Sequence, residues 1–286
     1  MRGVWANSMR SIRPLLLLGV LMAGCVRLGT QYQPVILPPG APTAQAILAE
    51  LAENEAALHT FKATGKFVLQ SPELEATQLL RESAIFFQSP ASLHVVGRKM
   101  ATNVVELTCV GDAFLVVFPT EKEYYYRPEG ERVEGQDASA IVREMFQPEP
   151  WAELAPRHVR ITGFDPQQQQ ATLEIYSGRR RNRLRRRLTL QGVPWVVIRN
   201  ERFDREGQLV AVTTKAEYHE QNGVRFPAQL ESTFPHVEAY MRFTMRRVWV
   251  NEELDQGDFA MTKRVEALGR KGYQAIEQYH AEASGS

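Results

Sequence analysis

The sequence predicts a mainly β domain of the α+β class, in which one amphipathic helix precedes a run of antiparallel strands. Two observations support this class. Residues 44–58 carry apolar side chains at helical spacing, whereas from Phe61 onward short segments alternate apolar and polar residues. Turn residues such as Gly111-Asp112 and Asn222-Gly223 separate these segments, which is typical of hairpins between antiparallel strands.

The helix is expected to begin after Thr43, because threonine is a favourable N-cap residue. Ile47, Leu48 and Leu51 lie on one stripe, and the glutamates of this segment fall mostly on the other side. A helix of this kind packs its apolar face against another element.

The strands follow in order, with residues 137–154 as the only long interruption, where a short helix and an irregular proline-containing stretch are expected. The expected strands are 62–70, 76–87, 93–98, 104–110, 114–118, 123–127, 159–164, 171–176, 184–190, 195–202, 209–218, 224–234 and 237–250. The last is the clearest, since apolar residues from Ala239 to Trp249 alternate with Arg242, Thr244 and Arg246. One face of this strand is therefore expected to be dry and the other wet.

The N-terminus has the features of an export signal with a special cysteine. A basic start is followed by the apolar run 15–21 and by small residues directly before Cys25. Met22-Ala23-Gly24-Cys25 resembles the lipobox of bacterial lipoproteins, in which the cysteine is acylated and becomes the new N-terminus. The stretch from Leu15 to Gly24 is about half of the roughly 20 residues that a membrane-spanning helix needs. A single-span anchor is the alternative interpretation.

Four regions follow from this pattern: a signal peptide over 1–24, an acylated cysteine with a proline-rich tether over 25–42, a β domain over 43–262 and a C-terminal tail over 263–286. The tail is interrupted by Gly269 and Gly272 and is compatible with either a helix or disorder. The 286-residue chain carries 34 basic and 33 acidic residues. Removing 1–24 takes away three arginines and no acid, so the mature chain has a formal charge of −2.

The composition and motifs exclude several classes of function. Near-neutral charge and export argue against nucleic acid as a partner. The six histidines are scattered, and no metal-binding, nucleotide-binding or nucleophile motif occurs, so we expect no metal, no cofactor and no enzyme. Cys109 is the only other cysteine and is expected to be a buried apolar residue.

The order of these elements resembles bacterial lipoprotein-sorting proteins of the LolA/LolB type. Residues 93–118 (LHVVGRKMATNVVELTCVGDAFLVVF) are similar to the third to fifth strands of that superfamily in layout, and 237–254 with Phe259 to its final strands. The resemblance implies a strongly curved antiparallel sheet, an unclosed half-barrel, with lidding helices. It also implies an apolar cavity that holds acyl chains.

The expected cavity wall consists of apolar residues of the helix and of inward-facing strand positions: Leu51, Leu107, Phe226, Leu230, Met241, Phe243 and Met245. Flexible methionine and large phenylalanine side chains suit an adaptable ligand. The same residues are equally typical of an ordinary core, and both interpretations stand at this point. In the LolB receptor, a loop between two early strands presents an exposed apolar residue to the membrane. The matching residue here is Met100.

An arginine-rich segment, residues 179–187, is the strongest charge feature. Arg181, Arg183, Arg185 and Arg187 are candidates for contact with anionic headgroups or an acidic partner. A solvated hairpin is the alternative.

We therefore expect a lipoprotein on the periplasmic face of the outer membrane, held there by an N-terminal lipid anchor. It would bind lipid or the acyl chains of lipoproteins for their sorting, with a periplasmic carrier protein as a further partner. A regulatory envelope-stress sensor on the same fold and a structural lipoprotein without cargo are the alternatives.

Overall fold

The computed structural model describes residues 36–72, 77–131, 142–143, 145–147, 150–177 and 183–276. Residues from Leu37 onward form one compact unit, to which all of the following refers. Cys25, the signal peptide and most of the expected tether lie outside the described residues.

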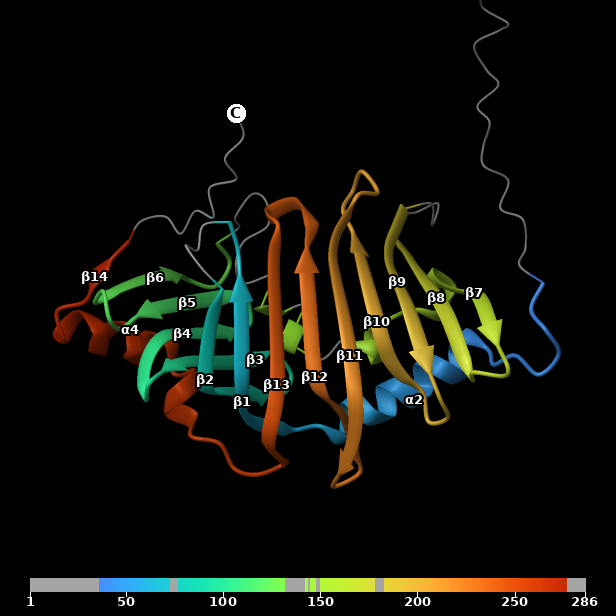
Figure 1. Cartoon of the computed structure of the whole chain (residues 1–286), viewed down its shortest axis with the longest axis horizontal. Helices are drawn as coiled ribbons and strands as arrows, with labels where there is room; N and C mark the ends of the chain where they lie inside the picture. Colours follow the sequence, from blue (N-terminus) through green and yellow to red (C-terminus); the bar gives the residue numbers. More distant parts are fainter. Residues whose placement is uncertain are drawn as a thin grey trace, which may run out of the picture. The chain divides into compact units, whose positions relative to one another are not determined.

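The described strands form a single sheet in the order β14-β6-β5-β4-β3-β2-β1-β13-β12-β11-β10-β9-β8-β7 (Figure 1). Their bounds are β1 Thr60–Gln70, β2 Gln78–Gln88, β3 Ser92–Lys99, β4 Thr102–Val110, β5 Ala113–Phe118, β6 Glu123–Arg127, β7 Val159–Asp165, β8 Gln170–Ser177, β9 Arg183–Gln191, β10 Val196–Phe203, β11 Leu209–Gln221, β12 Val224–Phe234, β13 Ala239–Val250 and β14 Gln274–Ala275. The expected mainly β, α+β fold is confirmed, with boundaries that differ by a few residues.

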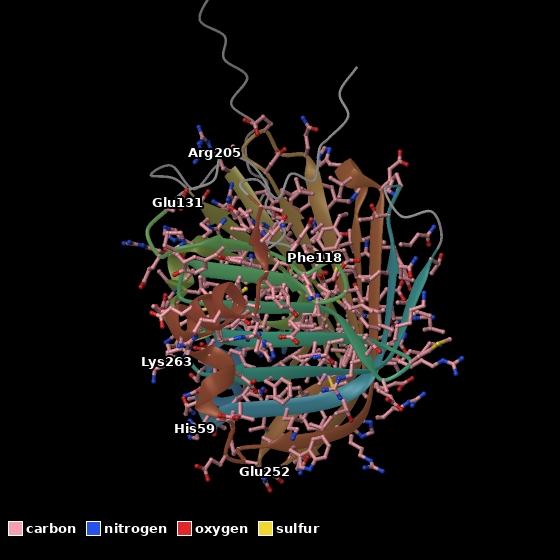
Figure 2. The ribbon with its side chains drawn as sticks, turned by 90° about the vertical axis from the view of Figure 1, so that its left-hand side faces the viewer. His59, Phe118, Glu131, Arg205, Glu252 and Lys263 are labelled. Carbon is pink, nitrogen blue, oxygen red and sulfur yellow. The ribbon has the colours of Figure 1, made fainter. Side chains whose placement is uncertain are left out.

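The sheet is curved and unclosed, as expected for a half-barrel. Figure 2 shows that the green strands nearest the viewer run across the picture while the strands behind them run upward, so the sheet coils around its inner face. Register shifts at Gly65 on β1, next to β2 and β13, contribute to this coiling, because a β-bulge bends its strand. A Cβ atom at Gly65 would lie 2.2 Å from the Thr244 carbonyl oxygen, so this close approach requires glycine.

Helix α2 (Ala44–Ala57) lies along the inner face, as the apolar stripe predicts (Figure 1). The Thr43 side chain caps it by accepting a hydrogen bond from the Ala46 N–H at 3.1 Å. Its buried Ile47, Leu48 and Leu51 pack with inward-facing residues of β7 to β10, among them Leu188 and Leu190. The helix is thus the expected lid on the concave side.

Helix α4 (Met261–Arg270) covers the outer face instead. Met261 packs with Ala113, Leu115 and Val117 of β5, and Figure 2 shows the helix, with Lys263, in front of the green strands. The short strand β14 follows and pairs in parallel with β6, so the sheet is mixed rather than wholly antiparallel. The first part of the expected C-terminal tail is therefore folded onto the domain.

The interruption between β6 and β7 is partly described. Val142 and Met145 are buried in the inner core, in the short helical stretch that the sequence predicts. Two single-turn 3-10 helices follow, η2 (Trp151–Glu153) and η3 (Pro156–His158). None of the described helices is long and apolar enough to cross a membrane.

Candidate functional site

A partly open cavity of about 140 Å³ lies between α2 and the inner face of the sheet. Much of its wall is apolar and is contributed by α2 and by β1, β12 and β13: Leu51, Leu58, Phe61, Phe226, Leu230 and Met245. Pockets for drug-sized ligands typically hold about 300–1,000 Å³, so this cavity is smaller than such a pocket.

Polar groups gather at the side of the cavity formed by α2 and the β11–β12 hairpin. Asn54, Glu55, Lys215, Tyr218 and Arg225 all line it. The Tyr218 hydroxyl donates to the Val197 carbonyl at 2.6 Å, and burial raises the pKa of this phenol well above its ordinary value. Tyr218 is therefore neutral and serves to join β11 to β10.

Three polar side chains of α2 tie the lid to the rest of the fold. Asn54 bonds to both backbone groups of Arg225 at the start of β12. Glu50 accepts a hydrogen bond from the Trp195 N–H at 2.9 Å, and Glu55 accepts one from the Ala152 N–H at 3.3 Å. The lid is thus held by hydrogen bonds that opening of the cavity would have to break.

The structure brings four of the seven expected cavity residues to this wall: Leu51, Phe226, Leu230 and Met245. The others lie in the core. Phe243 is fully buried against the rings of Phe67 and Phe146, Met241 is buried, and Leu107 packs on the same core from β4. The alternation of a strand gives the face of a residue, but it does not distinguish a cavity wall from packed interior. The role of these residues in binding a ligand stays a prediction.

Met100 lies at the tip of the β3–β4 hairpin with 91 % of its surface exposed. Lys99 pairs with Thr102, so Met100 and Ala101 are the two turn residues, and both have positive φ (49° and 64°). Positive φ at both central residues is the geometry of two-residue hairpin turns. The hairpin therefore presents Met100 to the surroundings, and its contact with a membrane stays a prediction.

The arginine-rich segment is only partly described, and Arg181 lies outside the described residues. Arg183 is exposed at the start of β9, and Arg185 is half-buried. Arg187 forms ion pairs with Glu174 at 2.9 Å and with Glu201 at 3.5 Å. Because neighbouring strands already neutralise Arg187, this residue gives no additional support to a site for anions or an acidic partner.

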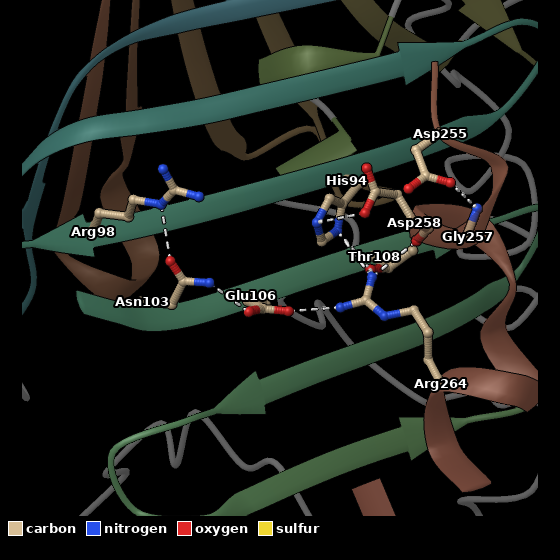
Figure 3. Close-up of polar contacts among 9 residues, drawn as sticks. All are labelled: His94, Arg98, Asn103, Glu106, Thr108, Asp255, Gly257, Asp258 and Arg264. Carbon is tan, nitrogen blue, oxygen red and sulfur yellow. Dashed lines mark hydrogen bonds and ion pairs between the residues drawn. The ribbon is translucent and has the colours of Figure 1, made fainter. Parts of the chain in front are cut away.

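The outer face carries a polar cluster that sequence reasoning missed (Figure 3). Arg264 of α4 donates to Glu106 and Thr108 of β4, both at 2.7 Å, and to the Asp258 carbonyl at 2.8 Å. The same guanidinium lies 3.1 Å from Nδ1 of His94, which is also 2.9 Å from the Thr108 hydroxyl. The cluster fixes α4 to the sheet, on the face opposite the cavity.

His94 is neutral in this cluster. Burial and then the charge of Arg264 lower its pKa from 6.5 to about 3. Because arginine only donates, Nδ1 of His94 accepts, and the ring proton is on Nε2, 4.0 Å from Asp258 Oδ1. Burial in turn raises the pKa of the Asp258 carboxyl above its ordinary value.

The polar cavity residues were also missed. Asn54, Lys215 and Arg225 stand in segments where polar residues alternate with apolar ones, as on any solvent-facing strand or helix. Asn222-Gly223 predicts the β11–β12 turn, but nothing in the sequence indicates that α2 approaches that hairpin.

No family model and no curated protein matches the sequence. Solved structures do match in fold. A DUF1329 family protein from Desulfovibrio piger has a TM-score of 0.57 and 10 % identity, covering 78 % of this chain and 99 % of its own. A putative outer membrane lipoprotein-sorting protein domain from Vibrio parahaemolyticus has a TM-score of 0.50 and 14 % identity, covering 77 % and 99 %.

A LolA superfamily protein from Nitrosomonas europaea reaches a TM-score of 0.49 at 15 % identity, covering 77 % and 98 %. At such identities the similarity concerns the fold. The chain shares the fold of the Desulfovibrio piger protein and of the lipoprotein-sorting protein domain from Vibrio parahaemolyticus, so the expected resemblance in fold is confirmed.

Proposed function

We propose that this protein is an envelope lipoprotein that binds acyl chains non-covalently between α2 and the concave face of its sheet, as part of lipoprotein sorting or transport to the outer membrane. The observation that carries the proposal is the cavity lined by Leu51, Phe226, Leu230 and Met245. Binding would be driven by burial of apolar surface, at about 25 cal/mol per Å² before ordering costs.

In the proposed function, helix α2 would act as a movable lid. Glu50, Asn54 and Glu55 fix α2 through hydrogen bonds, each with a net value of about 0.5–1.5 kcal/mol. To admit a longer chain, α2 would have to break these bonds and partly expose its buried Ile47, Leu48 and Leu51, which the apolar chain of the ligand would cover in turn. Release of the cargo needs no chemical step.

The remaining parts of the proposal concern the membrane. Acylation of Cys25 would anchor the mature chain, and residues 26–42 would let the domain stand off the bilayer. Valine, not aspartate, follows Cys25, which in the family favours the outer membrane. The exposed Met100 would enter the lipid surface when cargo is passed on.

The test is binding of a fluorescent fatty acid to residues 26–286, which contain the whole compact unit beginning at Leu37. Native mass spectrometry of the same protein would detect co-purified lipid. Leu230→Trp fills the cavity and should weaken binding at least tenfold. Thr233→Trp, at an exposed position on the opposite face of β12, is the matched control and should bind as the unmodified protein does.

Equal binding by both variants would refute the cavity as the site. A stable protein partner without lipid would favour the regulatory alternative, and neither lipid nor partner would favour a structural lipoprotein.

A further inference from the structure

Arg246 and Arg247 are consecutive residues of β13, and both are exposed. In a regular strand, successive side chains point to opposite faces of the sheet. Here the register of β13 against β1 shifts beside Gly65, and Arg246 is the additional residue of the β-bulge. Met245 and Val248, on either side of the pair, both pack against the inner core. The bulge therefore keeps both arginines on the outer face, where strict alternation would turn one of them inward.

Two lysines extend this positive charge on β1, which lies next to β13 (Figure 1). Lys62 and Lys66 alternate with the buried Ala63 and Phe67 of the inner core, so both lysines belong to the outer face. Because β1 pairs with β13 along this stretch, the backbone positions of the four cations lie within roughly 15 Å of one another. We call this group the basic face: Lys62, Lys66, Arg246 and Arg247.

The basic face is not neutralised by neighbouring carboxylates. None of its four cations forms an ion pair with an acidic side chain among the residues that the structure describes. Glu82 belongs to the β2 bulge beside Lys66 but is exposed and beyond ion-pair distance. The charge of Lys62 acts on the Asp258 carboxyl, so Lys62 contributes least to the free positive charge. The two arginines and Lys66 contribute most.

An aromatic ring lies among these cations. Nζ of Lys62 is 5.1 Å from the ring centroid of Trp249 and 5.7 Å from that of Phe86. Tryptophan is enriched at membrane–water interfaces, where lysine and arginine contact lipid phosphates. A peptide that adds to a sheet needs an unpaired strand edge, whereas these cations project from the face of two paired strands. The arrangement therefore favours a layer of headgroups over an acidic peptide.

The attraction has to be local, because the mature chain has a formal charge of −2. Near an anionic surface, each lysine or arginine strengthens binding about fivefold. The proposed acyl anchor at Cys25 would hold the domain beside a bilayer, and a tethered domain needs only modest affinity for that surface.

We infer that the basic face binds the phosphate headgroups of an anionic bilayer and thereby orients the anchored domain. The cavity, on the opposite face of the sheet, would then stay accessible from the aqueous side. This inference rests on the part of the proposed function that anchors the chain to a membrane, and it adds a second site to that function.

The experiment measures cosedimentation of residues 26–286, which lack the acyl anchor, with two kinds of vesicle. One kind is phosphatidylcholine, and the other contains one third phosphatidylglycerol. We expect binding to the anionic vesicles to be at least thirtyfold tighter at about 0.1 M salt. Most of this preference should be lost at about 1 M salt, because the Debye length falls from about 10 Å to about 3 Å.

Three double variants then locate the contact. Arg246→Gln/Arg247→Gln should weaken binding to the anionic vesicles about 25-fold. Arg246→Lys/Arg247→Lys keeps the charge and should bind nearly as the unmodified protein does. Arg157→Gln/Arg205→Gln removes the same charge from two exposed positions outside the basic face and is the matched control, with binding unchanged.

Several outcomes would overturn the inference. Equal binding to both kinds of vesicle would exclude an anionic bilayer as the partner. Equal losses in the Arg246/Arg247 and Arg157/Arg205 glutamine variants would show that only net charge matters. Binding of poly-glutamate without binding of anionic vesicles would replace the membrane by an acidic protein. Fatty-acid binding is measured on the same proteins, and its absence alone would refute the proposed cavity while leaving the basic face intact.

Discussion

Asn54 of the lid helix and Arg225 of β12 are joined through both ends of one side-chain amide. Nδ2 of Asn54 donates to the Arg225 carbonyl at 3.1 Å, and Oδ1 accepts from the Arg225 N–H at 2.7 Å. Among the described residues, β12 pairs with β13 from Gln229 to Phe234. At Arg225, the Asn54 amide supplies the backbone hydrogen bonds that a neighbouring strand would otherwise make. The lid is thereby hydrogen-bonded to the sheet like a strand.

The first prediction concerns this clamp. Asn54→Ala leaves two backbone groups of Arg225 without partners and should lower the free energy of unfolding by about 1–3 kcal/mol. Thermal denaturation measures the loss, and exchange of a bound fluorescent fatty acid should become faster. Glu53→Ala, at an exposed position on the same helix, is the control. An equal loss in both variants would contradict a specific clamp.

The second prediction is a loss of stability in acid that depends on His94. Its pKa is about 3 in the folded protein and 6.5 in the unfolded chain, so between these values the unfolded chain binds the extra proton. The stabilising effect is complete above pH 6.5 and is lost as the pH falls toward 3. At pH 4 the loss of stability relative to pH 7 amounts to roughly 3 kcal/mol.

Urea denaturation between pH 7 and pH 4 measures this effect. His94→Gln should have a flatter pH profile than the unmodified protein, while His236→Gln, at an exposed position, should not. Parallel profiles for all three proteins would show that His94 does not cause the acid lability.

The third prediction tests the close approach at the β1 bulge. Gly65→Ala places a Cβ atom 2.2 Å from the Thr244 carbonyl oxygen, which belongs to the backbone and cannot move aside cheaply. We expect a loss of about 2–4 kcal/mol, as for other strained backbone sites. Gly163→Ala is the matched control, because this strand glycine also lies at a register shift but its nearest neighbour is the Thr172 hydroxyl at 3.6 Å. Similar stability of the two variants would be evidence against the predicted clash.

The fourth prediction concerns the exposed tip of the β3–β4 hairpin. Met100→Gln should leave the stability within about 0.5 kcal/mol, as for other surface substitutions, because Met100 is 91 % exposed. It should reduce transfer of a bound fluorescent acyl chain to vesicles severalfold. Val193→Gln changes an exposed apolar residue of another hairpin and should transfer normally. Unchanged transfer by Met100→Gln would remove this residue from the proposed function.

Local pattern was sufficient for the secondary structure. The helix after Thr43 and the strand from Val224 to Phe234 have the predicted bounds to within a residue, because caps, turns and side-chain periodicity act over a few neighbouring positions. The order of strands also matched a known fold. For the C-terminal tail, the sequence left helix and disorder open. The helix α4 is stabilised by packing of its apolar side chains on β5, which is a contact between distant segments.

The cavity could be predicted only in part. Alternation correctly placed Phe226, Leu230, Met241 and Phe243 on the inner face, but the rings of Phe67 and Phe146 enclose Phe243 and exclude it from the cavity. Arg225 was missed because its importance depends on an amide that lies 171 residues earlier in the chain.

The sequence by itself determined the helix α2, the strands β1 to β13 and the fold class, since these depend on propensity and period. Only the tertiary structure decided where the cavity lies, which polar residues line it and which hydrogen bonds hold α2 against the sheet. Curvature of the sheet and contacts between distant segments create these features, and neither is encoded in any short stretch of residues.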